Sequence, residues 1–161
     1  MGPPTPVSDM TDTAFDPTPI LDAAAARAQA KNAPMRGLLT PAEAWQLFAA
    51  GALDLVDTRT NAERELIGLV PGSIAIEWYD YPAKIRNERF LDQLREHVAP
   101  ERPVAFLCRS GVRSQHAATL ATQQGWQAAY NILEGFEGDK NAAGQRRVNG
   151  WQNAGLPWTT T

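Results

Sequence analysis

The sequence predicts an α/β protein in which helices cover both faces of a central, mainly parallel β-sheet. Three short, strongly apolar segments are typical of buried strands and lie at 53–57, 104–107 and 128–133. Stretches with helical spacing separate them, and a further helix is expected at 113–124. Apolar strands that alternate with helices indicate a parallel sheet, because each crossover connection places a helix on one of its faces.

Composition is that of an ordinary globular protein and argues against several classes of partner. The 161 residues suffice for one domain with a proper core, and 43% of them are hydrophobic. The net charge of −3 has the wrong sign for a nucleic-acid or anionic-membrane surface, and no apolar run approaches the roughly 18 residues of a membrane helix. The first residues carry neither the basic nor the apolar segment of a secretory signal, so we expect a cytoplasmic protein.

Two segments precede the expected domain. Residues 1–17 are rich in proline and polar residues, which predicts a flexible arm. Residues 18–34 are rich in alanine and predict a helix and a linker, with Thr18 as the N-cap and Pro19 at the first helical position. We expect the domain proper at 35–158.

Local start and stop signals predict the remaining elements of the domain. A capping box with proline at the first helical position opens a helix, and a glycine closes it. A polar stretch after the first apolar strand is expected to be a loop, and a Pro-Gly turn leads into a short strand. In order, these elements are a helix from Thr40 to Gly51, a loop at 58–65, a strand at 73–76 and a helix at 85–97.

Cys108 directly follows the apolar strand at 104–107 and precedes the helix at 113–124. Ligands of parallel sheets bind at this kind of strand-to-helix junction. Because Cys108 is the only cysteine, the chain forms no intrachain disulfide. The chain has only two histidines, His97 and His116, to add to this cysteine as metal ligands, so we expect no metal site.

Two arginines flank this cysteine. Arg109 and Arg113 bring permanent positive charge to the start of a helix, where unpaired backbone N–H groups already favour an anion. Both effects predict a pKa of the Cys108 thiol below the free value of about 8.5, and therefore a thiolate at neutral pH. A lone cysteine is more often a small buried hydrophobe, but such a residue is not usually followed by a polar and basic run.

The other residues of this segment suit an anion-binding loop. Gly111 permits the positive φ with which successive amides curl around one atom, and Ser110 adds a hydroxyl donor. Ser114 is expected to cap the helix. His116 lies eight residues after Cys108, which is about 12 Å along a helix, so a protease-like cysteine–histidine pair cannot form.

The loop Cys108–Ser114, following an apolar strand, resembles the active-site loop of the rhodanese-like superfamily. The family usually has histidine at the position of Leu69 and glycine at that of Glu134. The resemblance covers about 35–158 and implies a rhodanese-like three-layer sandwich with a central, mainly parallel five-stranded sheet flanked by helices. Further family motifs match in the same order at Asp57-Thr58-Arg59, Glu63, 68–73, 133–136 and 150–158.

The resemblance also implies a sulfurtransferase that needs no cofactor. The Cys108 thiolate attacks the outer sulfur of thiosulfate or a related anionic donor and becomes a persulfide. An acceptor, which is cyanide or a thiol and can belong to a protein partner, then takes that sulfur. Backbone amides would hold the outer sulfur, an oxyanion-hole argument applied to sulfur. The substrate-binding residues would be Arg109, Ser110, Gly111, Val112, Arg113 and Ser114.

Two other functions stay open. A cysteine-dependent phosphatase also uses a thiolate in an anion-binding loop, but tyrosine-phosphatase loops place arginine after five residues, whereas Arg113 follows Cys108 after four. The shorter loop suits one terminal sulfur better than a tetrahedral phosphate. A non-catalytic rhodanese-like binding module is the second alternative, although inactive domains of this kind typically lack the cysteine.

Five residues outside the loop are candidates for the pocket. Asp57, Arg59 and Glu63 are expected to form an ion-pair brace at the end of a strand, with the alternative that Arg59 points toward the sulfur. Trp78 and Tyr79 either line the mouth of the pocket or are ordinary core or surface aromatics.

Overall fold

The structure, a computed structural model, describes residues 15–161. Most of the arm expected at 1–17 therefore lies outside the described residues. Within them, no helix is both long enough and apolar enough to cross a membrane.

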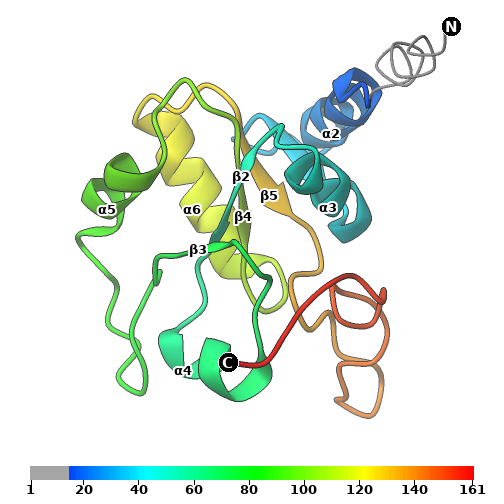
Figure 1. The fold of residues 1–161 in the computed structure, drawn as a ribbon, viewed down its shortest axis with the longest axis vertical. Coiled ribbons are helices and arrows are strands. Elements are labelled where there is room, and N and C mark those ends of the chain that lie inside the picture. Colours follow the sequence, from blue (N-terminus) through cyan, green and yellow to red (C-terminus); the bar gives the residue numbers. More distant parts are fainter. Residues whose placement is uncertain (1–14) are drawn as a thin grey trace, which may run out of the picture.

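A five-stranded sheet forms the centre of the molecule, and every neighbouring pair of strands is parallel. This confirms the predicted parallel sheet. Figure 1 shows the strands side by side, with β4 near the middle. In spatial order they are β1 (Gly37–Leu39), β5 (Ala129–Ile132), β4 (Val104–Leu107), β2 (Asp54–Asp57) and β3 (Ile74–Ala75).

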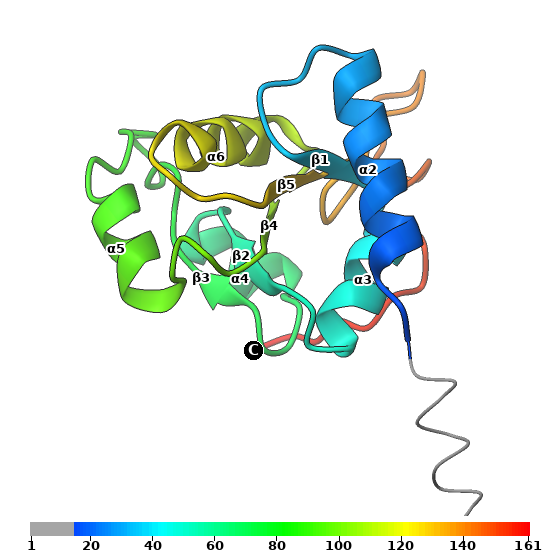
Figure 2. The ribbon, with the colours of Figure 1, turned by 90° about the horizontal axis from the view of Figure 1, so that it is seen from above.

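Helices lie on both faces of the sheet, as the alternation of strands and helices predicts. Figure 2 shows α6 and α3 on opposite sides of the strands. Successive residues of β4 serve the two faces in turn: Val104 and Phe106 pack with α5 and α6, while Ala105 and Leu107 pack with α3. The helices in the described part of the chain are α2 (Thr18–Ala30), α3 (Pro41–Ala49), α4 (Asn61–Ile67), α5 (Phe90–His97) and α6 (Val112–Gln123).

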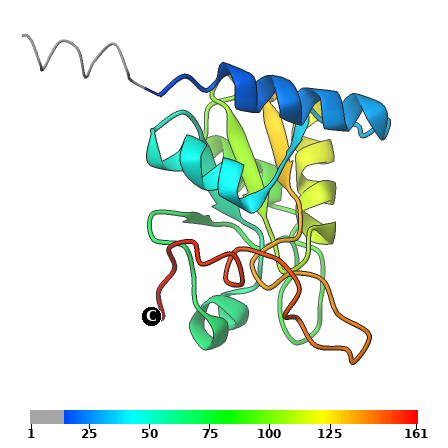
Figure 3. The same cartoon turned by 90° about the vertical axis from the view of Figure 1, so that its right-hand side faces the viewer.

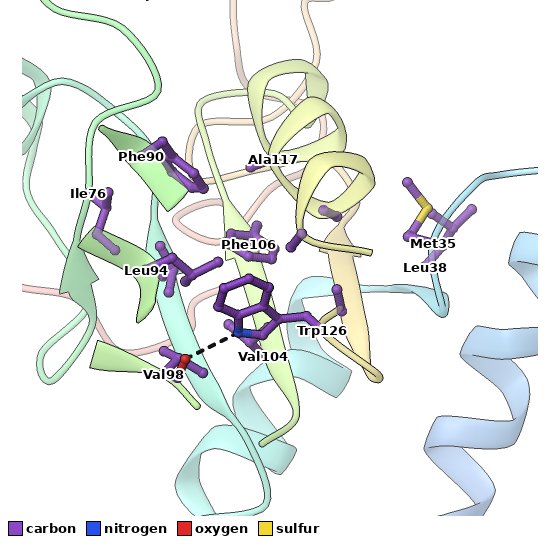
Figure 4. Close-up of a cluster of buried hydrophobic side chains, with 14 of the residues drawn as sticks. Met35, Leu38, Ile76, Phe90, Leu94, Val98, Val104, Phe106, Ala117 and Trp126 are labelled. Carbon is purple, nitrogen blue, oxygen red and sulfur yellow. Dashed lines mark hydrogen bonds between the residues drawn. The ribbon is translucent and has the colours of Figure 1, made fainter. Parts of the chain in front are cut away.

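The core on the α5 and α6 face is built around aromatic rings (Figure 4). Phe90 from α5 contacts Phe106 of β4 with 6.1 Å between ring centroids. Trp126, just after α6, is buried and donates its indole N–H to the carbonyl oxygen of Val98 at 3.2 Å. The hydrogen bond satisfies the one polar atom of this ring, so the indole can be buried without cost from an unpaired donor.

The alanine-rich helix α2 packs against the β1 edge of the sheet (Figure 3). Its small side chains allow a close approach, with Ala24 and Ala28 buried. Gly37 of β1 is required there, because a Cβ at this position would lie 2.8 Å from the Tyr130 ring and 2.9 Å from the backbone of Ala24. Arg27 fixes the helix to α3 through two hydrogen bonds with Glu43, of 2.7 and 2.9 Å.

The prediction of Thr18 as the N-cap of this helix is wrong. Pro17 occupies the N-cap, and Thr18 is the first helical residue. The Thr18 N–H instead donates to the carboxylate of Asp16 at 3.0 Å, so the capping oxygen comes from a residue two positions earlier.

The polar loop predicted at 58–65 is also wrong in part, because α4 begins at Asn61. Thr60 and Glu63 form a reciprocal capping box at its start. None of the residues of α4 is buried, so the segment has no apolar periodicity from which a helix could be predicted. The helix predicted at 85–97 begins only at Phe90. In the segment before it, Tyr79 and Arg86 form an isolated antiparallel β-bridge through their backbones.

Candidate active site

Cys108 lies at the carboxyl end of β4, between the ends of β2 and β5, in the order strand, cysteine, helix. Gly111 is the N-cap of α6 and has φ of 106°, the left-handed conformation expected for it. Backbone hydrogen bonds hold the loop from below: Phe136 donates its N–H to the Cys108 carbonyl oxygen at 2.7 Å, and Glu137 donates to that of Arg109 at 3.0 Å. The Cys108 side chain is buried, with 1% of the residue exposed.

Two polar groups face the sulfur. The Gly111 N–H donates to Sγ of Cys108 at 3.0 Å, and the Ser114 hydroxyl lies 3.2 Å from Sγ. Within residues 15–161, the N–H groups of Ser110, Val112 and Arg113 have no hydrogen-bond acceptor. A helix N-terminus with free N–H groups favours negative charge on an atom held there.

Ser114 does not cap the helix as predicted, because its hydroxyl is used elsewhere. It donates to Oδ1 of Asn131 at 2.6 Å, and Nδ2 of Asn131 donates to the Gly111 carbonyl oxygen at 3.2 Å. Both side chains are buried, so these bonds order the hydroxyl beside the sulfur. Asn131 is not predicted as a site residue, because the apolar residues around it indicate only a buried strand. A polar residue within a buried strand was the signal that could have identified it.

We call the segment 108–114 together with Asn131 the sulfur cradle. Gly135 supports it from behind: a Cβ there would lie 2.4 Å from the carbonyl carbon of Arg109, and its φ is 69°. Glu134, where the family commonly has glycine, also adopts a positive φ of 70°. Its carboxylate accepts a hydrogen bond from the Gly150 N–H at 3.0 Å, which ties the turn to the C-terminal segment.

Both arginines of the loop form ion pairs. Arg113 binds Glu63 with two hydrogen bonds of 2.7 and 2.9 Å, and Nε of Arg109 lies 3.0 Å from Glu137. Burial by itself would raise the pKa of Glu63, but the hydrogen bonds and charge of Arg113 outweigh it and lower that pKa to about 2. The same pairing overcomes the effect of burial on Arg113 and raises its pKa. Arg113 therefore connects α6 to α4, and it also lies over the Tyr79 ring at 4.8 Å.

The brace predicted from Asp57, Arg59 and Glu63 forms with different members. Asp57 and Arg59 are paired at 2.8 Å with both side chains fully buried, and Arg64 supplies a second arginine to Asp57 at 2.7 Å. Glu63 forms its ion pair with Arg113 instead. Arg59 also donates to the Gly68 carbonyl oxygen at 2.8 Å, and it is not among the residues that line the pocket.

A pocket of about 630 Å³ lies over the loop, bounded on one side by α4 and on another by the segment after β3. Trp78 and Tyr79 line it, and Trp78 also packs against the core through Phe90, with 5.2 Å between ring centroids. His116 lines it too, stacked on Trp78 with 6.2 Å between ring centroids. Lys84 and Arg146 also line the pocket and were not predicted. No group of metal-ligating side chains is found among residues 15–161.

Comparisons with known proteins agree with the geometry. The rhodanese-like domain family matches residues 40–142. The chain belongs to the rhodanese-like family. This rhodanese-like protein is similar to Rv0390 from M. tuberculosis, with 39% sequence identity, a TM-score of 0.70, and coverage of 77% of this chain and 97% of that one.

Two curated relatives extend the comparison to other bacteria. Thiosulfate sulfurtransferase GlpE of Haemophilus influenzae is 29% identical over 126 residues, which cover 76% of this chain and 94% of that protein. An uncharacterized protein of Rickettsia conorii is 33% identical over 109 residues, 65% of this chain and 80% of that protein. The family to which this chain belongs thus includes proteins named as sulfurtransferases.

Proposed function

We propose that this rhodanese-like protein is a sulfurtransferase that carries a sulfane sulfur as a persulfide on Cys108. The observation that carries the proposal is the position of Sγ at the start of α6, 3.0 Å from the Gly111 N–H and 3.2 Å from the Ser114 hydroxyl. A backbone N–H that donates to the sulfur at the N-terminus of a helix stabilises negative charge on that sulfur. The name of the Haemophilus influenzae relative supports thiosulfate as a donor.

The reaction has two steps. In the first, the Cys108 thiolate attacks the outer sulfur of thiosulfate, the S–S bond of thiosulfate breaks, and sulfite leaves with the electron pair. In the second, cyanide or a thiolate attacks the outer sulfur of the persulfide, and the electron pair of the broken S–S bond returns to Cys108. The free N–H groups of Ser110, Val112 and Arg113 are suited to hold the outer sulfur between the two steps.

The pairing of Arg113 favours this chemistry over phosphate transfer. In a phosphatase loop, the arginine binds the oxygens of the phosphate with its guanidinium. Arg113 stands one position before the place where phosphatase loops carry this arginine, and Glu63 binds its guanidinium with two short hydrogen bonds. We place the sulfur transfer in the cytoplasm, where a free thiol such as Cys108 is kept reduced.

Intact-mass measurement tests the proposal directly. Incubation with thiosulfate should add the mass of one sulfur atom to the chain, and later addition of cyanide should remove it and release thiocyanate. Cys108→Ser should abolish both events while the protein stays folded. Absence of the adduct in the wild-type protein would refute the proposed function, and turnover of an aryl phosphate would favour the phosphatase.

A further inference from the structure

The pocket over the cysteine loop, which is lined by Arg109, Ser110, Val112 and Arg113 and not by Cys108 itself, is large for the substrates of the simplest sulfur transfer. Its volume is about 630 Å³, within the range of roughly 300–1,000 Å³ in which pockets take organic ligands. Thiosulfate and cyanide have only a few atoms each. Figure 1 shows that α4, the segment after β3 and the C-terminal segment lie around the same end of the sheet, where the strands have their carboxyl ends. The size of the pocket therefore favours an organic substrate for one of the two steps.

Apolar side chains line this pocket although they are exposed. Leu66 of α4, Tyr81 of the segment after β3 and Val112 of α6 are 80%, 63% and 62% exposed. They come from three separate elements but share one pocket. Exposed apolar groups gathered in a cavity are typical of a surface that an organic ligand covers.

The charges of the pocket leave two cations available. Four basic and two acidic residues line it, and the two acidic ones, Glu63 and Glu137, are paired with Arg113 and Arg109. In the described part of the chain, Lys84 and Arg146 have no carboxylate within salt-bridge distance. The pocket is therefore positive because of these two residues and not because of the arginines of the cysteine loop.

Arg146 is held in place on the C-terminal segment. Its Nη1 donates to the Gly138 carbonyl oxygen at 2.6 Å, and its own carbonyl oxygen accepts a hydrogen bond from Asn153 at 3.2 Å. Its Nη2 has no hydrogen-bond partner among residues 15–161 and, unlike the buried Nε, is not sealed from solvent. A positioned guanidinium with an unused N–H is suited to a carboxylate, which accepts hydrogen bonds from two guanidinium nitrogens at once.

We propose that Arg146 binds the carboxylate of a small organic thiol that serves as the sulfur acceptor, with Lys84 as a second cation. The apolar part of the thiol lies against Leu66 and Val112. This inference rests on the proposed function, because it concerns the second step. The acceptor thiol releases its proton to solvent, and its thiolate attacks the outer sulfur of the Cys108 persulfide. The S–S bond breaks, its electron pair returns to Cys108, and the acceptor leaves as an organic persulfide.

Two matched probes test the charge of the acceptor. N-acetylcysteine carries a carboxylate, and N-acetylcysteine amide is neutral. Each is mixed with protein whose Cys108 has been loaded from thiosulfate, and the loss of the added sulfur is followed by intact mass. Arg146→Gln should slow the reaction of the acid about three- to tenfold and that of the amide less than about twofold. For each probe, the rate with the variant is divided by the rate with the wild-type protein, so the different intrinsic reactivity of the two thiols cancels.

Three further variants make the result specific. Arg147→Gln, at an exposed neighbouring arginine, should change neither reaction. Arg146→Lys should keep most of the preference for the acid, and Lys84→Gln should lose less of it than Arg146→Gln does. Equal slowing of acid and amide, or no slowing of either, would overturn the inference while the persulfide still forms. If thiosulfate adds no sulfur to Cys108, the proposed function fails, and this inference fails with it.

Discussion

The sulfur cradle and the pocket above it lie against each other, yet the chain builds them in different ways. The cradle takes all but one of its residues from the continuous segment 108–114, and its contacts are buried backbone and hydroxyl groups. The pocket takes its walls from four separate segments, and many of its side chains are exposed. The residues proposed for sulfur chemistry thus lie close together in the sequence, whereas the surface proposed to choose a substrate depends on the tertiary fold.

The largest effect should come from breaking the support of the cradle. Gly135→Ala places a Cβ within 2.4 Å of the Arg109 backbone at a φ of 69°. We expect a loss of more than about 3 kcal/mol in the free energy of unfolding and no persulfide on Cys108. Urea denaturation and intact mass measure the two effects.

Gly144→Ala is the matched control for this glycine. It has a similar φ of 79°, but a Cβ there meets nothing within 4 Å. The backbone conformation alone should cost about 1–2 kcal/mol, and sulfur loading should persist. Similar losses in the two alanine variants would show that contact with the cradle is not what requires Gly135.

A smaller effect should follow from disturbing the cradle through Asn131. Asn131→Ala removes the acceptor of the Ser114 hydroxyl and the donor to the Gly111 carbonyl oxygen. The Gly111 carbonyl oxygen then lacks its side-chain donor, and the Ser114 hydroxyl is no longer held in place beside the sulfur, so we expect sulfur loading from thiosulfate to slow about tenfold. Stopped-flow mixing followed by intact mass gives the rate, and circular dichroism shows whether the fold is kept.

A double-mutant cycle shows whether Asn131 acts through the hydroxyl. If it does, Asn131→Ala combined with Ser114→Ala should be no slower than the slower of the two single variants. Multiplicative slowing in the double variant would mean that Asn131 affects the sulfur by another route, such as the position of Gly111.

The smallest of the three effects concerns the contact between the two regions. The folded pKa of Glu63 is about 2, below its ordinary value of 4.5. A lowered carboxyl pKa adds stability above the unfolded pKa, and this stability is lost as the pH falls through 4.5 toward 2. Between pH 6 and pH 2, the wild-type protein should therefore lose about 1–3 kcal/mol more of its unfolding free energy than Glu63→Gln does. Glu65→Gln, at an exposed position of the same helix, should behave like the wild type.

The same contrast explains how much the sequence could predict. The parallel sheet and the strand-to-helix position of Cys108 follow from apolar segments and local spacing, which need no knowledge of distant contacts. The pairing of Arg113 with Glu63 joins residues 50 positions apart, and α4 buries no residue from which its periodicity could be predicted. Asn131 and Arg146 reach the site only through the parallel pairing of β4 with β5 and the course of the C-terminal segment.

The burial of Cys108 has a consequence for how the protein distinguishes its empty state from its loaded one. With 1% of the residue exposed, Cys108 is shielded from bulky alkylating reagents, whereas thiosulfate has only a few atoms. A second sulfur extends the side chain by one S–S bond, about 2 Å. In the proposed persulfide, the terminal sulfur would therefore lie farther from the backbone than Sγ does, and it would be more accessible than the thiol of the empty protein. If Cys108 carries the proposed persulfide, we therefore expect a bulky alkylating reagent to react faster with the loaded protein than with the empty one.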